Sequence, residues 1–222
     1  MKKYVIKKAK KTPKLGALWN ASDWKNGQSL SIDNFLPESS EHRPETKTKL
    51  LYDEKGIHGF FMVKDKYIRC MHTEFQSPVC RDSCVEFFFQ PIENKGYFNF
   101  EFNCGGAFLC NYIENNTRVK NGFTKYAKLD KDDMAQVKVF HSMPKVVEPE
   151  IQEKTTWFLG FHIPFKLIEK RTGKLGDISG QEWRGNFYKC GDKTSHPHWA
   201  AWSPVSYLDF HLQKCFSSLV FE

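Results

Sequence analysis

Long apolar runs are missing from this chain of 222 residues. No segment approaches the roughly 20 consecutive apolar residues that a membrane-spanning helix requires, so the sequence predicts no membrane span. The lysine-rich start, MKKYVIKKAKK, has the charge of a signal peptide but lacks the apolar stretch that must follow it. The chain as given therefore shows no export signal, and its localisation stays open.

Cysteines with the usual spacing of zinc ligands are also missing. The seven cysteines form no CxxC pair and are odd in number. Several lie in apolar, strand-like segments, where a free cysteine behaves as a small apolar residue. We interpret them as buried thiols, which favours a cytoplasmic protein; one or two disulfides, or a metal site, are the alternatives.

Acidic residues are absent from the first 14 positions, which hold seven lysines. The remaining 26 basic residues equal the 26 acidic ones, so the net charge of +7 belongs to this segment alone. A nucleic-acid-binding protein carries its positive charge on a folded face, so no nucleic-acid partner is predicted. We interpret residues 1–14 as a solvated basic arm and residues 15–222 as a single domain; attachment of the arm to anionic polymers is the alternative.

Helical periodicity is almost absent, whereas alternation typical of strands recurs along the chain. Short strands separated by turns predict an all-β, antiparallel, immunoglobulin-like sandwich with one or two short helices, and residues 165–170 are the candidate helix. Residues 111–133 look like a polar, turn-rich connection. The strands are expected within residues 49–63, 84–90, 97–103, 135–141, 156–164, 182–190 and 217–221.

Two of these segments, CVEFFFQ and YFNFEFN, predict a hairpin around the turn PIENKG. The simplest register that keeps both apolar faces in the core opposes Phe89 to Phe98 and Phe87 to Phe100. It also opposes Glu86 to Glu101 on the polar face. Carboxylates and amides on one sheet face suit a ligand rich in hydroxyl groups.

Two like charges directly across a strand pair destabilise a sheet, so something should offset Glu86 and Glu101. The candidates are an arginine such as Arg184, a calcium ion, a shared proton or a hydroxylated ligand. The enzymatic alternative is a glycoside hydrolase, since carboxyl groups on neighbouring strands can approach the spacing of about 5–5.5 Å in retaining enzymes.

Four motifs in this order carry a resemblance: Asp82–Phe89, Asn99–Asn103, Trp183–Asp192 and His196–Pro204. Together they resemble a family 9 carbohydrate-binding module of the branch common in Bacteroidetes. The resemblance implies a β-sandwich related to DOMON domains, saccharide binding without catalysis, a role in polysaccharide degradation, and a periplasmic or extracellular location.

In that family two tryptophans hold a sugar ring while polar side chains bind its hydroxyl groups. The resemblance assigns the platform to Trp202 and hydroxyl-binding roles to Glu86, Asn103 and Asn186. The chain departs from the pattern twice: Cys80 stands where the second tryptophan is expected, and Glu101 stands where founding members have a basic residue.

The residues themselves add further candidates for ligand binding. Trp199 is a second flat apolar ring, and Arg184 and Tyr188 alternate onto the same face as Asn186. His196 and His198 flank Pro197 and are interpreted as a turn rather than a metal site. A haem held by methionine and histidine, and a structural or interaction sandwich that has lost the sugar clamp, stay open as alternatives. No cofactor is expected, apart from calcium as a candidate, and the oligomeric state is open.

Overall fold

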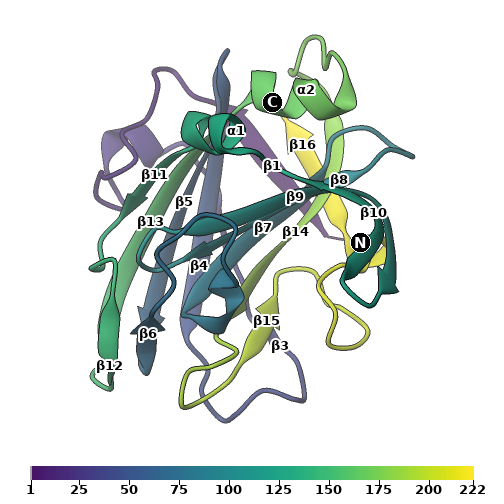
Figure 1. Cartoon of the computed structure of the whole chain (residues 1–222). Helices are drawn as coiled ribbons and strands as arrows, with labels where there is room; N and C mark the ends of the chain where they lie inside the picture. The colour runs from purple at the N-terminus through teal and green to yellow at the C-terminus, as the bar shows by residue number, and fades with distance from the viewer. Residues whose placement is uncertain (1) are drawn as a thin grey trace.

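The computed structural model describes residues 2–222 and consists mainly of strands (Figure 1). The predicted all-β class with short helices is confirmed. The helices are α1 (Lys131–Gln136) and α2 (Phe165–Thr172). The strands are β1 (Lys3–Lys8), β2 (Ser29–Ser31), β3 (Asn34–Phe35), β4 (Glu45–Tyr52), β5 (Gly56–Asp65), β6 (Ile68–Cys70), β7 (Cys84–Gln90), β8 (Tyr97–Asn103), β9 (Phe108–Val119), β10 (Gly122–Lys128), β11 (Lys138–His141), β12 (Val147–Ile151), β13 (Thr155–Pro164), β14 (Glu182–Cys190), β15 (Trp199–Ala201) and β16 (Ser217–Phe221).

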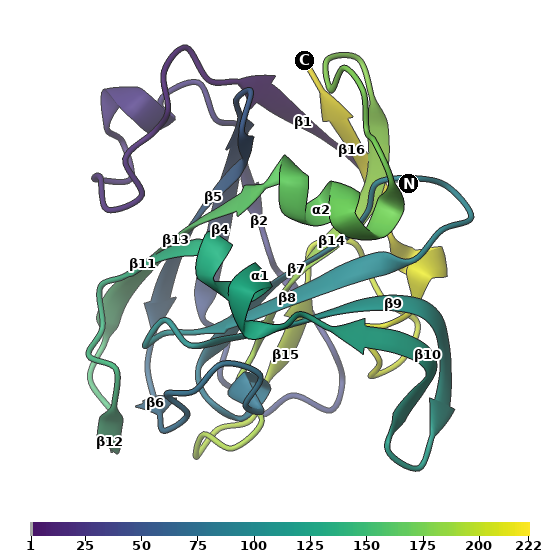
Figure 2. The ribbon, with the colours of Figure 1, turned by 45° about the horizontal axis from the view of Figure 1, so that its top comes forward.

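Most strands follow one hydrogen-bonded path, in the order β10-β9-β8-β7-β14-β16-β1-β4-β5-β13-β11. The path folds into two halves, one centred on β7, β8 and β14 and the other on β4, β5 and β13, which Figure 2 shows at an angle to each other. Short strands extend each half: β15 and β3 beside β14, and β2 beside β4. Strands β6 and β12 form a separate two-stranded sheet.

Strand β1 joins the two halves and corrects the interpretation of residues 1–14 as a solvated arm. Lys3–Ile6 pairs in parallel with β16, and Lys7 and Lys8 pair in parallel with β4. Tyr4 and Ile6 are buried, while the lysines on either side of them, Lys3, Lys7 and Lys8, are exposed. The sequence pattern did not predict this strand, because it is only six residues long and lysines flank its two buried residues.

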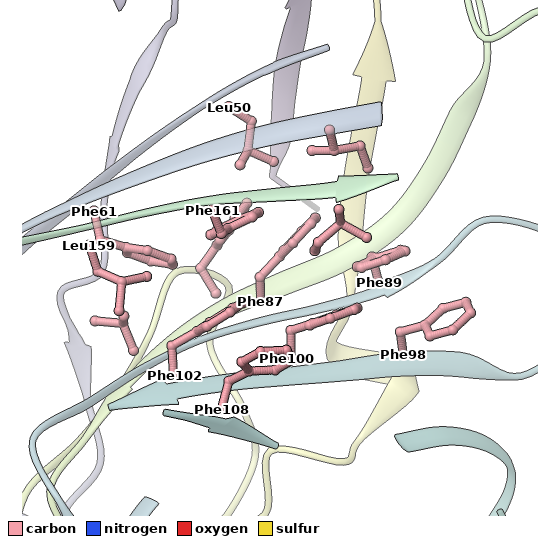
Figure 3. Packing of buried hydrophobic residues seen from close by; sticks show 14 of the residues in the cluster. Leu50, Phe61, Phe87, Phe89, Phe98, Phe100, Phe102, Phe108, Leu159 and Phe161 are labelled. Carbon is pink, nitrogen blue, oxygen red and sulfur yellow. The ribbon is translucent and has the colours of Figure 1, made fainter. Parts of the chain in front are cut away.

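The core lies between the two halves and is rich in phenylalanine (Figure 3). Phe87 and Phe102 come from the β7–β8 hairpin, and their rings lie 6.1 Å and 5.1 Å from the ring of Phe161 on β13. Phe61 on β5 approaches Phe187 on β14 in the same way, at 6.4 Å. Aromatic pairs at this spacing add to the free energy gained from burial.

Outside the β7–β8 hairpin, the predicted elements are only partly right. The candidate helix at residues 165–170 is confirmed as α2, which ends at Gly173 with φ of 83°. The predicted strand at residues 135–141 is wrong at its start, because α1 occupies residues 131–136 after its N-cap, Asp130. Residues 111–133 are not a loose connection, because most of them form β9 and β10. Neither α-helix in the described part of the chain is long and apolar enough to cross a membrane.

All seven cysteines are free thiols, as predicted. Five of them are buried, and Cys80 and Cys215 are partly exposed.

Candidate functional site

The β7–β8 hairpin has the register expected from its alternation. Phe89 pairs with Phe98, and Glu86 pairs directly with Glu101. The apolar side of the hairpin faces the core, and the other side carries the two carboxyl groups. That second side is not open to solvent, since Glu86 is 2% exposed and Glu101 is 8% exposed.

A cleft of about 400 Å³ opens over these two glutamates. We call it the carboxylate cleft. Its volume falls within the range of small-molecule sites. Its lining combines apolar and aromatic side chains with charged groups: Cys80, Glu86, Phe88, Glu101, Arg118, Cys190, Asp192, Trp199, Leu208, Asp209, Phe210 and His211.

Burial dominates the electrostatics of the two glutamates. Burial raises the pKa of Glu86 well above its ordinary value, and the charge of Glu101 raises it further. Burial also raises the pKa of Glu101 to about 7, although the hydrogen bond from Asn99 Nδ2 (2.8 Å) opposes the shift. Near neutral pH the pair therefore carries at least one proton, which is one of the compensations expected for two opposed carboxylates.

The arginine at this site is Arg118 on β9, not Arg184 as the sequence suggested. Arg118 lines the carboxylate cleft and forms an ion pair with Asp209 (3.1 Å). Arg184 lies opposite Gln90 on β7, and its Nη2 donates to the carbonyl of Phe216 (2.6 Å). Arg184 therefore anchors the chain before β16 and does not line the cleft.

The segment 203–216 covers one side of the carboxylate cleft, and Tyr188 holds it there. The ring of Tyr188 stacks on Phe210 at 4.0 Å, and its hydroxyl donates to the Phe210 carbonyl (2.9 Å). His211 lies 2.8 Å from the hydroxyl of Tyr97, measured to Nδ1. Tyr188 is fully buried, so it positions this segment and does not itself line the cleft.

Trp199 is the tryptophan that lines the carboxylate cleft, whereas Trp202 belongs to the core. Trp199 is partly exposed, lines the carboxylate cleft and donates from Nε1 to Asp192 (2.7 Å). Trp202 is 5% exposed and packs edge-on against Tyr4 and Phe187 at 6.3 Å and 5.8 Å. The expectation that Trp202 forms the platform is therefore wrong for this chain.

The two asparagines assigned to hydroxyl binding are used within the fold instead. Asn103 donates to the His72 carbonyl (2.7 Å) and to Asp82 (2.8 Å), and it accepts from the Ala107 amide (2.9 Å). Asn186 donates to the Ser203 carbonyl (2.8 Å) and accepts from the Ser203 amide (2.9 Å). Both are completely buried and outside the cleft lining, which corrects the prediction for them.

Cys80 and Asp192 line the carboxylate cleft beside Trp199. The Asp192 amide donates to the Cys80 carbonyl (3.0 Å), which ties the two residues together. Burial raises the pKa of Asp192. Asp192 was not predicted, and its only sequence signal is the position two residues after Cys190 at the end of a strand.

Metal-binding donors also lie beneath the carboxylate cleft. Cys84, Glu86 and Cys190 present ligand atoms within 4.8 Å of one another. Burial raises the pKa of Cys84 to about 12, which disfavours the thiolate that a metal requires, and Cys190 instead donates to Glu86 Oε1 (3.2 Å). Calcium beside Glu86 and Glu101 stays a prediction.

The structure also shows how the histidines considered as metal or haem ligands are placed. His198 is fully buried; its Nδ1 lies 2.9 Å from the His196 carbonyl, and its Nε2 lies 2.7 Å from the buried Lys189 ammonium. The chain bends at His196, and the interpretation of His196–His198 as a turn rather than a metal site stays a prediction. A haem between His58 and His162, two histidines that the sequence offers as axial ligands, has no room, because their rings stack on each other at 4.5 Å.

The structure is thus a β-sandwich with a cleft on one sheet face. Residues 19–221 match the model of carbohydrate-binding family 9, so the chain belongs to this family of non-catalytic carbohydrate-binding modules. The resemblance inferred from the four motifs is confirmed.

Solved structures support the assignment. A crystallised protein from Bacteroides uniformis, described as a candidate carbohydrate-binding protein, is 26% identical with a TM-score of 0.85, covering 100% of this chain and 99% of that one. A family 9 module from Caldicellulosiruptor kristjanssonii has the same fold, at 11% identity. Its complex with glucose gives a TM-score of 0.58, with 100% of this chain and 96% of that one covered. Its complex with cellotriose gives a TM-score of 0.60, with 100% of this chain and 94% of that one covered. A search of curated proteins finds no match.

Proposed function

We propose that this protein binds saccharides in the carboxylate cleft without cleaving them, as part of a system that degrades polysaccharides. The observation that carries the proposal is the convergence of Trp199, the Glu86–Glu101 pair and the Arg118–Asp209 ion pair on one cleft. Membership of carbohydrate-binding family 9 supports it, as do the sugar complexes of the Caldicellulosiruptor module.

The chemistry of the lining suits a sugar. The indole of Trp199 offers a flat apolar surface to the CH face of a pyranose ring, while carboxyl groups and Arg118 can exchange hydrogen bonds with its hydroxyls. A glutamate pair that holds a proton near neutral pH can both donate and accept. Cys80, at the position where the family resemblance expects a second tryptophan, also lines the cleft.

Binding is expected to be weak. A disaccharide has about 23 heavy atoms, and about 0.3 kcal/mol per atom sets a limit near −7 kcal/mol, or about 10 μM. With one aromatic ring in place of two, the dissociation constant should move towards the millimolar range.

Isothermal titration with glucose, cellobiose and cellotriose tests the site. Trp199→Ala should weaken binding at least about tenfold, since the platform contributes most of the apolar contact. Trp19→Ala is the matched control, because Trp19 is also partly exposed but packs on Phe60, outside the cleft. Equal affinities for the wild type and Trp199→Ala would place the sugar site elsewhere.

Release of reducing sugar from oligosaccharides separates binding from hydrolysis. The proposal expects no release above the rate of a Glu86→Gln, Glu101→Gln double variant. Turnover that the double variant abolishes would instead establish the glycoside hydrolase alternative.

A further inference from the structure

A second group of polar side chains lies away from the carboxylate cleft, where β4 and β13 end and β5 begins near α2. Asp53 sits in the β4–β5 turn, and His58 on β5 pairs directly with His162 on β13. One ligand atom from each of the three residues lies within 4.8 Å of the other two. The two imidazole rings also stack on each other, with their centroids 4.5 Å apart.

The histidines of this group have polar atoms that the fold leaves without hydrogen bonds. His58 is 2% exposed, and its Nε2 lies 3.0 Å from Asp53 Oδ2, an ion-pair contact. His58 Nδ1 and His162 Nε2 are buried and have no hydrogen-bond partner. An imidazole nitrogen that is buried without a partner is costly, unless a ligand completes it.

The Asp53 carboxylate is held in place by its own turn. Its Oδ1 accepts from the amides of Lys55 (2.8 Å) and Gly56 (3.2 Å), which fixes the carboxylate plane. Its Oδ2, the atom nearest His58, also accepts from the hydroxyl of Thr12 (2.8 Å). Supporting contacts of this kind orient metal-ligating carboxylates.

The local backbone leaves room beside the rings and an opening to solvent. A Cβ atom at Gly56 would lie 2.8 Å from His162 Nε2 and would clash with the Ile163 carbonyl, so only glycine fits there. Asp53 and His162 also line a groove of about 650 Å³ beside α2. Strand β13 leads directly into α2 (Figure 2), which places the groove next to His162.

We propose that Asp53, His58 and His162 bind a divalent transition-metal ion, with a further coordination position facing this groove. Two imidazoles and one carboxylate suit Zn²⁺, Co²⁺ or Fe²⁺, whereas Ca²⁺ and Mg²⁺ prefer oxygen ligands alone. Three protein ligands with an open position are typical of exchangeable zinc sites. Bonds of about 2.0–2.1 Å to a tetrahedral ion set the donor atoms about 3.4 Å apart, so the three side chains would close around the ion from separations of up to 4.8 Å.

Titration of the metal-free protein with ZnCl₂ tests the proposal. One ion per chain should bind with a dissociation constant of about 1 μM or below, and CaCl₂ should not compete. His162→Gln should weaken zinc binding at least about 100-fold. The matched control is His141→Gln, which changes a partly buried histidine of the adjacent strand β11 and should bind zinc like the wild type.

Cobalt distinguishes this site from the buried cysteines in the unaltered protein. Co²⁺ bound by nitrogen and oxygen should give visible absorption without the strong near-ultraviolet band of thiolate ligation. Sugar affinity and the melting temperature without metal report whether His162→Gln is folded. A thiolate band, zinc affinity unchanged in His162→Gln, or no saturable zinc binding by the wild type would each overturn the proposal.

Discussion

Glu86 and Glu101 hold protons that the unfolded chain would release. Their ordinary pKa is 4.5, and in the folded protein burial raises that of Glu101 to about 7 and that of Glu86 well above 4.5. A raised pKa means that the folded state binds more protons than the unfolded state above about pH 4.5. The stability associated with the pair is therefore complete below that pH and is lost as the pH rises through 7.

Replacing Glu101 by glutamine should consequently have an effect that depends on pH. At pH 4 the variant should be close to the wild type, because Glu101 is then protonated in the folded chain and mostly protonated in the unfolded chain. At pH 8 it should be more stable by at least about 0.2–1 kcal/mol, since a neutral amide avoids both the burial of a charged carboxylate and the like-charge repulsion. Denaturant unfolding of both proteins from pH 4 to 8 gives this difference, and the titration of all other groups affects both proteins alike. The same variant should bind sugar less tightly, because a charged acceptor makes the stronger hydrogen bond. Lower stability at pH 8 with unchanged sugar affinity would assign the pair to the scaffold.

Cys80 is the residue at which this chain departs most from a two-tryptophan clamp. Cys80→Trp should tighten sugar binding by about 0.5–1.5 kcal/mol, because a second ring can contact the sugar across from Trp199. Titration calorimetry measures the change, and Cys215→Trp, a partly exposed cysteine outside the cleft lining, serves as the control. Weaker binding by Cys80→Trp would show that the cleft is too narrow for two rings.

Strands were predictable where one face is buried along their whole length. The β7–β8 hairpin alternates without a break, so its register followed from the requirement that both apolar faces enter the core. The outer parts of β9 and β10 are exposed or partly exposed on both faces, so no alternation marks them. Strand β1 hides two core residues among lysines, because its outward face is solvated.

The role of β1 leads to a prediction that opposes the dispensable-arm interpretation. Tyr4→Ala should destabilise the protein by about 3–5 kcal/mol. The substitution removes a buried ring that packs on Phe187 and Trp202 and a hydroxyl that accepts from the Leu50 amide (2.8 Å). Lys3→Ala, on the exposed face of the same strand, should change stability by less than about 0.5 kcal/mol. If thermal unfolding gives equal melting temperatures for the two variants, β1 does not join the sheets as described.

The sequence pattern did not predict which of Trp199 and Trp202 is buried in the core. Residues three apart in an extended segment point to opposite faces, so Trp199 and Trp202 are expected on different sides of the sheet. Which one depends on pairing with β14, where Trp199 lies opposite Cys190 and the Trp202 amide donates to the Phe187 carbonyl (2.9 Å). The alternation of apolar and polar residues does not predict how β15 pairs with β14, because β15 is only three residues long.

At the scale of the whole molecule, the carboxylate cleft is built by segments far apart in the sequence. Glu86 and Glu101 come from one predicted hairpin, but Arg118 comes from β9 and the covering segment 203–216 follows β15. The hairpin was predictable from local alternation. The covering segment was not, since its position depends on buried contacts of Tyr188 and Asn186 that only the folded chain brings together.

The central claim is that a sugar binds between Trp199 and Arg118, above the two glutamates. Soaking crystals of the protein with cellotriose tests it most directly, because the electron density locates the ligand without any substitution. We predict density for at least one sugar ring stacked on Trp199, with hydroxyl groups within hydrogen-bond distance of Glu86 or Glu101. Ordered sugar elsewhere with the carboxylate cleft vacant, for example in the groove beside α2, would contradict this account.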